Sequence, residues 1–423
     1  MWTRPEPKLV GTLLSYLNAV MKNKPLIPIF LIVFIDLLGF GVIIPLLPAY
    51  AASFGLNETA IGLLLASYSA MQLIGAPVLG RISDRFGRKP LLLVSQAGTL
   101  IGFVILALAN SAPLLFLSRL LDGFTGGNLS IAQAAIADVT DEKDRAKAYG
   151  LIGAAFGLGF ILGPALGGLL SRWGYAAPAW AAAIISALSI LLTAIFFPET
   201  RRSSASPAQA ARREFSLAAL RHALDNPTLL RLLTFGFLFN FAFSIFQTTF
   251  ALFSKSQFNF DVEQTGYMLG YIGIIIVIAQ VGVLPRLVKQ LGEQRTVILG
   301  SASLAGGMLL TGLITTWPPL LGTLILTALG GAVVNPSLQS LYTKSVGADE
   351  RGGTLGLAAS VDSLSRIFAP IWGGWVLQNL GVHAPALSSA IVLLLALGFI
   401  LAMLRPAFWA PRLQSVPVEA EIR

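Results

Sequence analysis

The sequence predicts an all-α integral membrane protein whose helices form two similar six-helix bundles. Apolar residues make up 55% of its 423 residues and charged residues only 12%, whereas a soluble chain carries about 25% charged residues. The apolar residues gather in long runs, and stretches of the two halves match each other at a fixed offset. Such runs are too long for barrel strands, so we expect helices to cross the membrane.

Twelve runs are apolar over the roughly 20 residues that a helix needs to cross a bilayer. They lie at residues 27–50, 59–80, 90–110, 113–137, 146–171, 178–198, 229–253, 264–285, 296–316, 318–343, 353–379 and 384–404. The apolar stretch at 9–21 has helical spacing but is too short to span. We expect it to lie as an amphipathic helix on the membrane surface and not to be a cleaved signal.

The positive charges predict the orientation of these spans. Of the 29 Lys and Arg residues, Arg172 and Lys255 fall on one side, Arg119 and Arg366 lie within spans, and all others fall on the opposite side. Cytoplasmic loops are enriched in Lys and Arg, so we expect both termini in the cytoplasm and the chain in the cell (inner) membrane. This distribution explains the net charge of +9 without nucleic acid as a partner.

A polar segment divides the chain into two halves. Residues 199–228 follow the sixth span and contain the sequence RRSSASPAQAARRE. We therefore expect a cytoplasmic N-terminal segment at 1–26, a first bundle at 27–198, a linker at 199–228, a second bundle at 229–405 and a cytoplasmic tail at 406–423.

The halves are predicted to be structural repeats. At an offset of 206 residues, Arg145 matches Arg351 and Pro164 matches Pro370. The same offset relates Gln133 to Gln339, Gly150 to Gly356, and the pair Gly167–Gly168 to Gly373–Gly374. Repeated six-span halves with a substrate site between them are an architecture of secondary transporters.

The residue types exclude most catalytic and metal sites. The sequence has no cysteine and only two histidines, His222 and His383, both in predicted loops, so disulfides and thiolate metal sites are excluded. No phosphate-binding loop, nucleotide motif or catalytic triad occurs. We therefore expect no enzyme activity, no metal and no cofactor other than a proton gradient.

Five charged residues fall inside predicted spans, where charge is costly and usually functional. Asp36 lies in the middle third of span one, and a carboxylate there can alternate between a proton and a substrate. Arg119 stays charged and lies on span four with Asp122, so these three residues can form a proton switch. The alternative is a static ion pair that fixes how spans one and four pack.

The other two charged residues, Asp362 and Arg366, are four residues apart on span eleven and can pair within one helix. Because such a pair neutralises itself, a structural role is the stronger interpretation, and proton coupling is the alternative.

Polar residues within the spans suggest the lining of a substrate cavity. They are Gln72, Asn128, Gln133, Asn240, Gln247, Asn335 and Gln339, and we add Phe243 from the phenylalanine-rich span seven. The alternative role for these polar side chains is hydrogen bonding between helices.

Four motifs carry a family resemblance. The loop between spans two and three reads Gly80-Arg81-Ile82-Ser83-Asp84-Arg85-Phe86-Gly87-Arg88-Lys89, and Arg119 is followed by Gly123 and Gly126. Span five contains Gly153, Gly157 and Gly159 and then Gly163-Pro164-Ala165-Leu166-Gly167-Gly168, and span one contains Asp36, Gly39, Gly41, Pro45 and Pro48. Residues 27–405 thereby resemble the major facilitator superfamily, within it the twelve-span drug:proton antiporters, and are similar to tetracycline-efflux pumps.

The resemblance implies proton-coupled export of lipophilic, drug-like molecules by a monomer whose partners are substrate, protons and lipids. It implies that Asp84, with Gly80, Arg85, Gly87 and Arg88, closes the cytoplasmic side by contacting the start of span eleven. The glycines of span five and Pro164 would seal or hinge the halves. Tetracycline pumps carry an aspartate inside the third span, and residues 97–102 have no acid here, so the substrate is expected to differ. The alternatives are a lipid or glycolipid translocase and a non-transporting receptor or scaffold.

Overall fold

The computed structural model describes residues 26–140, 155, 157–159, 161–200, 225–347 and 350–403, and every regular element in this part of the chain is a helix. The predicted surface helix at 9–21, most of the linker and the C-terminal tail lie outside the described residues. The all-α fold that the sequence predicts is confirmed, and each of the twelve predicted spans falls on helix, with span five described only in part.

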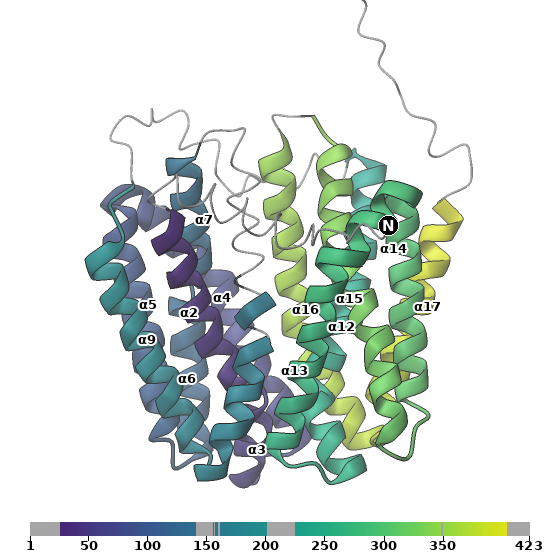
Figure 1. The fold of residues 1–423 in the computed structure, drawn as a ribbon, viewed down its shortest axis with the longest axis horizontal. Coiled ribbons are helices and arrows are strands. Elements are labelled where there is room, and N and C mark those ends of the chain that lie inside the picture. The colour runs from purple at the N-terminus through teal and green to yellow at the C-terminus, as the bar shows by residue number, and fades with distance from the viewer. Residues whose placement is uncertain are drawn as a thin grey trace, which may run out of the picture.

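The first half begins with α2 and ends with α9 (Figure 1). Its elements are α2 (Leu26–Ile43), α3 (Leu46–Ser53), α4 (Glu58–Phe86), α5 (Arg88–Ala107), α6 (Ala112–Thr125), α7 (Asn128–Val139), the helical residues 161–170, the 3-10 turn η1 (Ser171–Trp173) and α9 (Ala176–Phe196). The second half consists of α12 (Pro227–Phe258), α13 (Val262–Ile278), the π-helical turn η2 (Ala279–Val283), α14 (Leu284–Thr311), α15 (Pro318–Lys344), α16 (Arg351–Leu380) and α17 (Ala384–Met403).

Several predicted spans are broken helices. Seven continuous helical stretches among the described residues are long and apolar enough to cross a membrane, and the α2–α3 pair, bent by 40°, makes an eighth. The bend lies at Pro45, which lacks the N–H that a continuous helix would use. Span four is divided at Gly126 and Gly127 into α6 and α7, with 14 and 12 residues. Each piece of span four is therefore too short to cross alone.

The two halves also match after spans two and eight, where the offset between them is 205 residues instead of 206. Gly87 and Gly292 correspond at an offset of 205 residues, and both have positive φ angles, 107° and 77°. They lie where the chain turns from span two into three and from span eight into nine. A positive φ favours glycine because it has no Cβ, which explains why glycine occurs at both positions.

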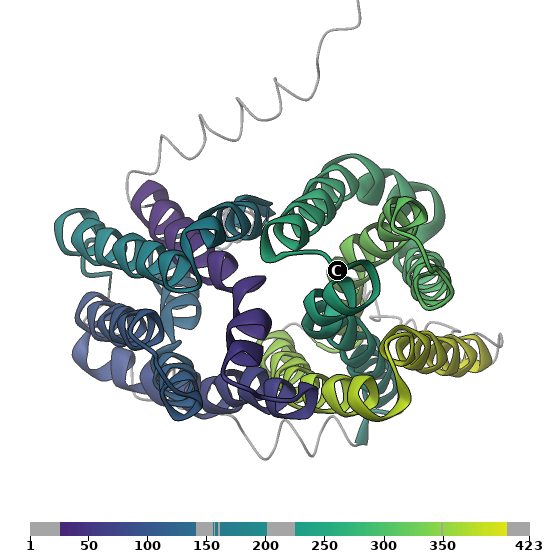
Figure 2. The ribbon, with the colours of Figure 1, turned by 90° about the horizontal axis from the view of Figure 1, so that it is seen from below.

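The two halves lie side by side (Figures 1 and 2) and meet at the end that carries α3. There the Thr59 hydroxyl donates to Gln378 Oε1 over 2.7 Å, and Arg172 pairs with Glu263. The buried cluster around Leu46 and Leu115 includes Leu252 and Leu377 from the second half. We call this the closed end, and we call the opposite end, which carries Asp84 and Arg88, the basic end.

Candidate transport site

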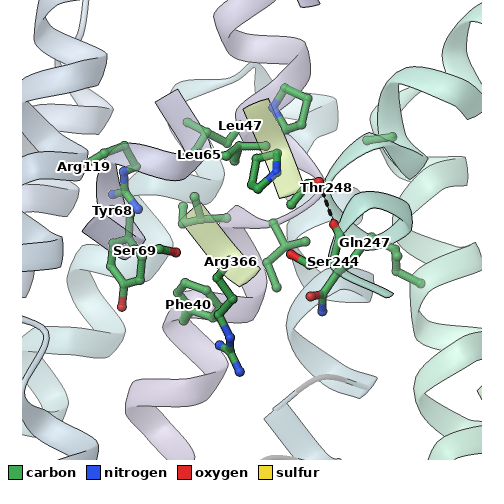
Figure 3. Close-up of a pocket in the computed structure, with 16 residues that line it drawn as sticks. Phe40, Leu47, Leu65, Tyr68, Ser69, Arg119, Ser244, Gln247, Thr248 and Arg366 are labelled. Carbon is green, nitrogen blue, oxygen red and sulfur yellow. Dashed lines mark hydrogen bonds between the residues drawn. The ribbon is translucent and has the colours of Figure 1, made fainter. Parts of the chain in front are cut away.

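A cavity lies between the two halves (Figure 3). Helices α2 to α4 and α6 contribute to it from the first half, and α12, α13 and α16 from the second. Including its open mouth, the empty space between the halves is about 930 Å³. Its lining is Phe40, Ile43, Ile44, Leu47, Pro48, Leu65, Tyr68, Ser69, Arg119, Ser244, Gln247, Thr248, Ala251, Leu269, Arg366 and Pro370.

The polar groups of the lining come from opposite walls. Figure 3 shows Arg119 and Tyr68 on one side, Ser244, Gln247 and Thr248 on the other, and Arg366 between them. A largely apolar cavity with a few convergent polar groups is the usual form of a small-molecule site. The geometry therefore marks this cavity as the candidate substrate site.

Asp36 lies on α2 but does not line this cavity. The Ser189 hydroxyl of α9 donates to Asp36 Oδ1 over 2.7 Å, and the Gln96 amide of α5 donates to that hydroxyl over 2.8 Å. Asp36 Oδ2 is buried and has no hydrogen-bond partner among the described residues. A buried carboxylate oxygen without a donor is a place where a proton can bind.

Arg119 and Asp122 form the contact that the sequence predicts. Arg119 Nη1 lies 3.2 Å from Asp122 Oδ2, and both side chains are buried. The guanidinium lies over the Phe103 ring, 5.7 Å from its centroid. Arg119 reaches the cavity whereas Asp122 does not. No ion pair joins Arg119 to Asp36 within the described residues, so this conformation unites only two of the three predicted switch residues.

Asp362 and Arg366 also form the predicted pair within one helix. Arg366 Nη2 and Nε lie 2.9 Å and 3.1 Å from Asp362 Oδ2. The Arg366 side chain is 55% exposed and lines the cavity (Figure 3). The sequence predicted a pair that neutralises itself, but it did not predict that Arg366 would line the cavity.

The predicted loop at 80–89 is helical except for Gly87, which alone separates α4 from α5, and this junction is organised around Arg88. Its buried guanidinium contacts Asp84 at 2.6 Å, Asp138 at 2.9 Å and the Ser83 hydroxyl at 2.6 Å. Arg88 thus pairs with Asp84 one turn before it. Asp138 of α7 was missed, although a carboxylate near the end of span four was a visible signal.

The carboxylate of Glu199 lies on the N-terminus of α5. Its two oxygens accept from the backbone N–H of Arg88 at 2.8 Å and of Lys89 at 3.2 Å, where unpaired N–H groups and the helix dipole favour an anion. A Cβ on Gly87 would lie 2.5 Å from Glu199 Oε2. Glu199 therefore ties the end of span six to the start of α5. On the last turns of α4, Arg85 lies over the Phe86 ring, and a Cβ on Gly80 would have nothing within 4 Å.

The glycines of span five allow close helix contacts on two sides. A Cβ on Gly163 would lie 2.6 Å from Gly41 Cα, and one on Gly167 would lie 2.1 Å from the Val42 carbonyl oxygen. On the other side, Gly168 faces the Glu263 backbone at 3.0 Å. On this second side, Gly157 also faces Val277, and the carbonyl oxygen of Pro164 faces Gly266. The motif therefore packs span five against span one and against span eight of the other half, and Gly153 lies outside the described residues.

Gly167→Ala is expected to destabilise the protein, by about 1–3 kcal/mol for an overpacked site. The added methyl group would meet a backbone carbonyl, which cannot move aside as a flexible side chain can. Gly80→Ala is the matched control, because nothing lies within 4 Å of its Cβ position. Thermal unfolding in detergent compares the two variants, and equal stability would contradict the close contact.

The other predicted cavity residues lie in different surroundings. Gln72 donates to the Tyr68 hydroxyl and to Gly126 O, both at 3.2 Å, which fits the alternative of bonding between helices. Of the predicted set, Gln247 alone lines the cavity of Figure 3. Asn128 lies close to Asp36, and the Phe243 ring packs against Gly331 and Phe239. The repeat mates Gln133 and Gln339 are exposed, whereas Asn240 and Asn335 are half-buried.

Sequence reasoning missed the small polar side chains of the cavity. Ser69, Ser244 and Thr248 line it, but such residues are frequent on membrane helices and carry no pattern of their own. Tyr68 also lines it, and its position one turn before Gln72 was a usable signal. Ser189 and Gln96, which hold Asp36, could not be found because they come from two other helices.

Arg172 and Glu263 form an ion pair that joins the halves at the closed end. Arg172 donates to both carboxylate oxygens, and the Tyr267 hydroxyl donates to Glu263 Oε1 over 2.6 Å. The Arg172 hydrogen bonds, followed by that from Tyr267, lower the pKa of Glu263 to about 2 from its ordinary 4.5. We call this pair the closed-end latch.

Glu263→Gln is expected to shift the protein modestly toward the state open at this end, because exposed ion pairs contribute little. The lowered pKa means that the latch stabilises the closed end fully above the ordinary pKa and is lost as the pH falls toward about 2. Spin-label distances across the closed end should therefore not change between about pH 5 and 8. Tyr267→Phe is the control, since it keeps the ion pair. An unshifted Glu263→Gln distribution would show that the pair is no latch.

Comparison with known proteins decides the family. The family model described as Major Facilitator Superfamily matches residues 29–314 and 283–420. The chain belongs to the major facilitator superfamily. Tetracycline resistance protein, class C, from Escherichia coli is 33% identical over 353 residues, which cover 82% of this chain and 88% of that protein. Multidrug resistance protein 2 from Bacillus subtilis (strain 168) is 29% identical over 373 residues, 86% of this chain and 92% of that one.

Solved structures of the superfamily have the same fold. The human organic anion transporter MFSD10 (TETRAN) is 27% identical, with a TM-score of 0.68 over 89% of this chain and 99% of that one. The nucleoside transporter NupG has a TM-score of 0.74 over 89% and 98% of the chains at 15% identity, which shows the fold alone. This major facilitator protein is thus a secondary transporter related to tetracycline and multidrug efflux pumps, and it is not an enzyme.

Proposed function

We propose that the protein exports lipophilic, drug-like small molecules in exchange for protons by alternating access. The observation that carries this proposal is Asp36, whose buried Oδ2 lacks a partner among the described residues within the half that forms one wall of the cavity. A carboxylate without a counter-cation is costly inside a membrane bundle, and uptake and release of a proton would explain why it occurs there.

The basic end is assigned to the cytoplasm because Lys and Arg are enriched in cytoplasmic loops. With that assignment, the closed-end latch lies on the outer side, and both termini are cytoplasmic. Asp84, held here by Arg88, is the residue that we propose to move to the start of α16 when the cytoplasmic side closes. With the same orientation, we propose that the N-terminal segment, the linker between the two bundles and the C-terminal tail lie on the cytoplasmic side.

The proton switch works through Arg119, which touches both the cavity and Asp122. Protonation of Asp36 removes a negative charge from the first half, and a change in the Arg119–Asp122 contact then alters the cavity wall. Arg119 has five N–H donors and remains charged throughout, so it can keep one contact while it exchanges another. Asp362 and Arg366 are a second pair that can follow the same reorientation.

The relatives support drug-like substrates, and the third span supports a substrate other than tetracycline. In α5, Gly98 and Gly102 lie directly against Thr125 and Asp122 of α6. The third span, which has no acidic residue, thus packs against α6, which carries Asp122. The carboxylate therefore lies on a different helix from the third-span aspartate of tetracycline pumps. A site with its charges on other helices is expected to select other molecules.

Transport by the full-length protein in proteoliposomes tests this proposal. With an acidic lumen, uptake of a lipophilic substrate from outside should depend on the pH gradient and stop when a protonophore is added. The panel should include organic anions, cations and neutral compounds together with a labelled phospholipid. Uptake that ignores the gradient, or movement of the lipid alone, would contradict proton-coupled drug export.

A further inference from the structure

The charged groups that face the cavity are all cations. Arg119 and Arg366 line it, whereas their partners Asp122 and Asp362 do not, and no other described charged residue does. A cationic ligand would therefore meet two guanidinium groups before either carboxylate. The paired carboxylates offset part of this charge, but the guanidinium groups lie nearer to the cavity, so the cavity favours an anion over a cation.

Both guanidinium groups retain donors that their ion pairs do not use. Arg119 is almost fully buried, and its Nη2 is buried without a hydrogen-bond partner among the described residues. Arg366 donates to Asp362 Oδ2 through its Nε and Nη2 atoms. Its third guanidinium nitrogen, Nη1, has no partner among the described residues. Arg119 Nη2 is enclosed by protein, whereas the exposed guanidinium of Arg366 is open to an acceptor oxygen in the cavity.

The remaining walls define the rest of the ligand. Phe40, Ile43, Leu65 and Leu269 supply apolar surface, and Ser69 and Gln247 supply neutral hydrogen-bonding groups. Tyr68 accepts from Gln72 and keeps its own O–H to donate. The cavity thus offers a cationic centre surrounded by apolar walls.

We propose that the cavity binds an amphipathic organic anion, with a carboxylate or sulfonate held by Arg366 and an apolar body against the walls. Arg366 is the anchor because its side chain is 55% exposed, whereas that of Arg119 is 3% exposed. An Arg fork binds carboxylates through two parallel, charge-assisted bonds. The inference rests on the proposed function in taking this cavity as the substrate site. Asp36 is separate from the anchor and lies on the other half, so proton coupling runs through the change of conformation.

Equilibrium binding to the purified full-length protein tests the anchor with three probes that share one ring system. They are naphthylacetate, naphthylacetamide and naphthylethylammonium. Wild type should bind the anion about tenfold more tightly than the amide, as expected for a charge-assisted pair, and bind the ammonium probe most weakly. Arg366→Gln should lower the affinity for the anion to that for the amide and leave amide binding unchanged, which also shows that the variant is folded.

Two further variants make the test specific. Arg366→Lys keeps the charge but loses the fork, so its anion preference should be intermediate. Lys255→Gln removes an exposed charge outside the cavity and should bind like wild type. The proposal is overturned if wild type binds the ammonium probe as tightly as the anion, if Arg366→Gln and Arg366→Lys both keep the full preference, or if no probe binds.

The binding test separates this inference from proton-coupled export, because it needs no gradient. If the protein binds the anion through Arg366 but moves no protons, the anchor is supported and the proposed proton coupling is contradicted. A protein that exports organic cations against a proton gradient, with Arg366→Gln fully active, retains the coupling and loses the anchor.

Discussion

Asp36→Asn is expected to reduce gradient-driven transport to the level of vesicles without protein. The substitution keeps the shape of the side chain and a hydrogen bond with Ser189, but an amide cannot take up a proton in this pH range. Because folding does not depend on that proton, exchange of labelled for unlabelled substrate, which requires no net proton movement, should persist. Uptake driven by a pH gradient and counterflow are measured in the same proteoliposomes.

Ser189→Ala is the matched control for this variant. It removes the donor that lies 2.7 Å from Asp36 Oδ1 and keeps the carboxylate, so gradient-driven transport should remain. If Asp36→Asn transports as well as wild type under a pH gradient, Asp36 is not the proton site. Loss of both transport and counterflow would indicate a structural role instead.

Arg119→Met is expected to lower stability by about 3–5 kcal/mol, the usual effect of removing one partner from a buried ion pair. The change leaves the buried Asp122 carboxylate without the cation 3.2 Å away. Arg366→Met is the matched control within the same protein. Its pair is about half exposed, so the loss there should be only about 0–1 kcal/mol. Unfolding of detergent-solubilised protein measures both.

The double variant Arg119→Met/Asp122→Leu separates the pair from its partners. Replacing both charges with apolar groups removes the uncompensated carboxylate, so most of the lost stability should return. Transport should stay lost, because the switch residues are gone. A double variant no more stable than Arg119→Met would refute the interpretation that Asp122 depends on Arg119.

The fold could be predicted from sequence because its determinants are local or periodic. Long apolar runs mark spans wherever they occur, and the matched positions of Gly87 and Gly292 require the same positive φ in both halves. The breaks in spans one and four were harder to place. They depend on Pro45 and on Gly126–Gly127, and the same residue types also occur inside unbroken helices, such as Pro77 in α4.

The candidate site could be predicted mainly where charge marks it, and of the neutral side chains predicted to line the cavity only Gln247 does so. Intramembrane charges are rare, so Arg119–Asp122 and Asp362–Arg366 were visible as pairs. The partners of Asp36 were not visible, because Ser189 and Gln96 are small or neutral and meet it only after three helices pack. Exposure also required the structure, because Arg366 lines the cavity whereas Asp362, one turn away, does not.

The carboxylate at the start of α5 is a contact that the sequence did not predict. The contact of Asp84 with the start of span eleven is predicted for the state in which the cytoplasmic side is closed; in this structure Arg88 pairs with Asp84, and Glu199 occupies the N-terminus of α5. A free helix end accepts a carboxylate from any segment that reaches it. Which segment reaches it is decided by the packing of spans and by the conformational state.

Proton movement driven by a substrate gradient tests proton-coupled exchange at Asp36 most directly. Proteoliposomes are loaded with a substrate that the protein transports and diluted into substrate-free, weakly buffered medium, and a pH-sensitive dye reports the lumen. We expect the lumen to become acidic as substrate leaves in wild type and to stay unchanged with Asp36→Asn. An unchanged wild-type lumen, protons that leave with the substrate, or equal acidification by Asp36→Asn would contradict the account.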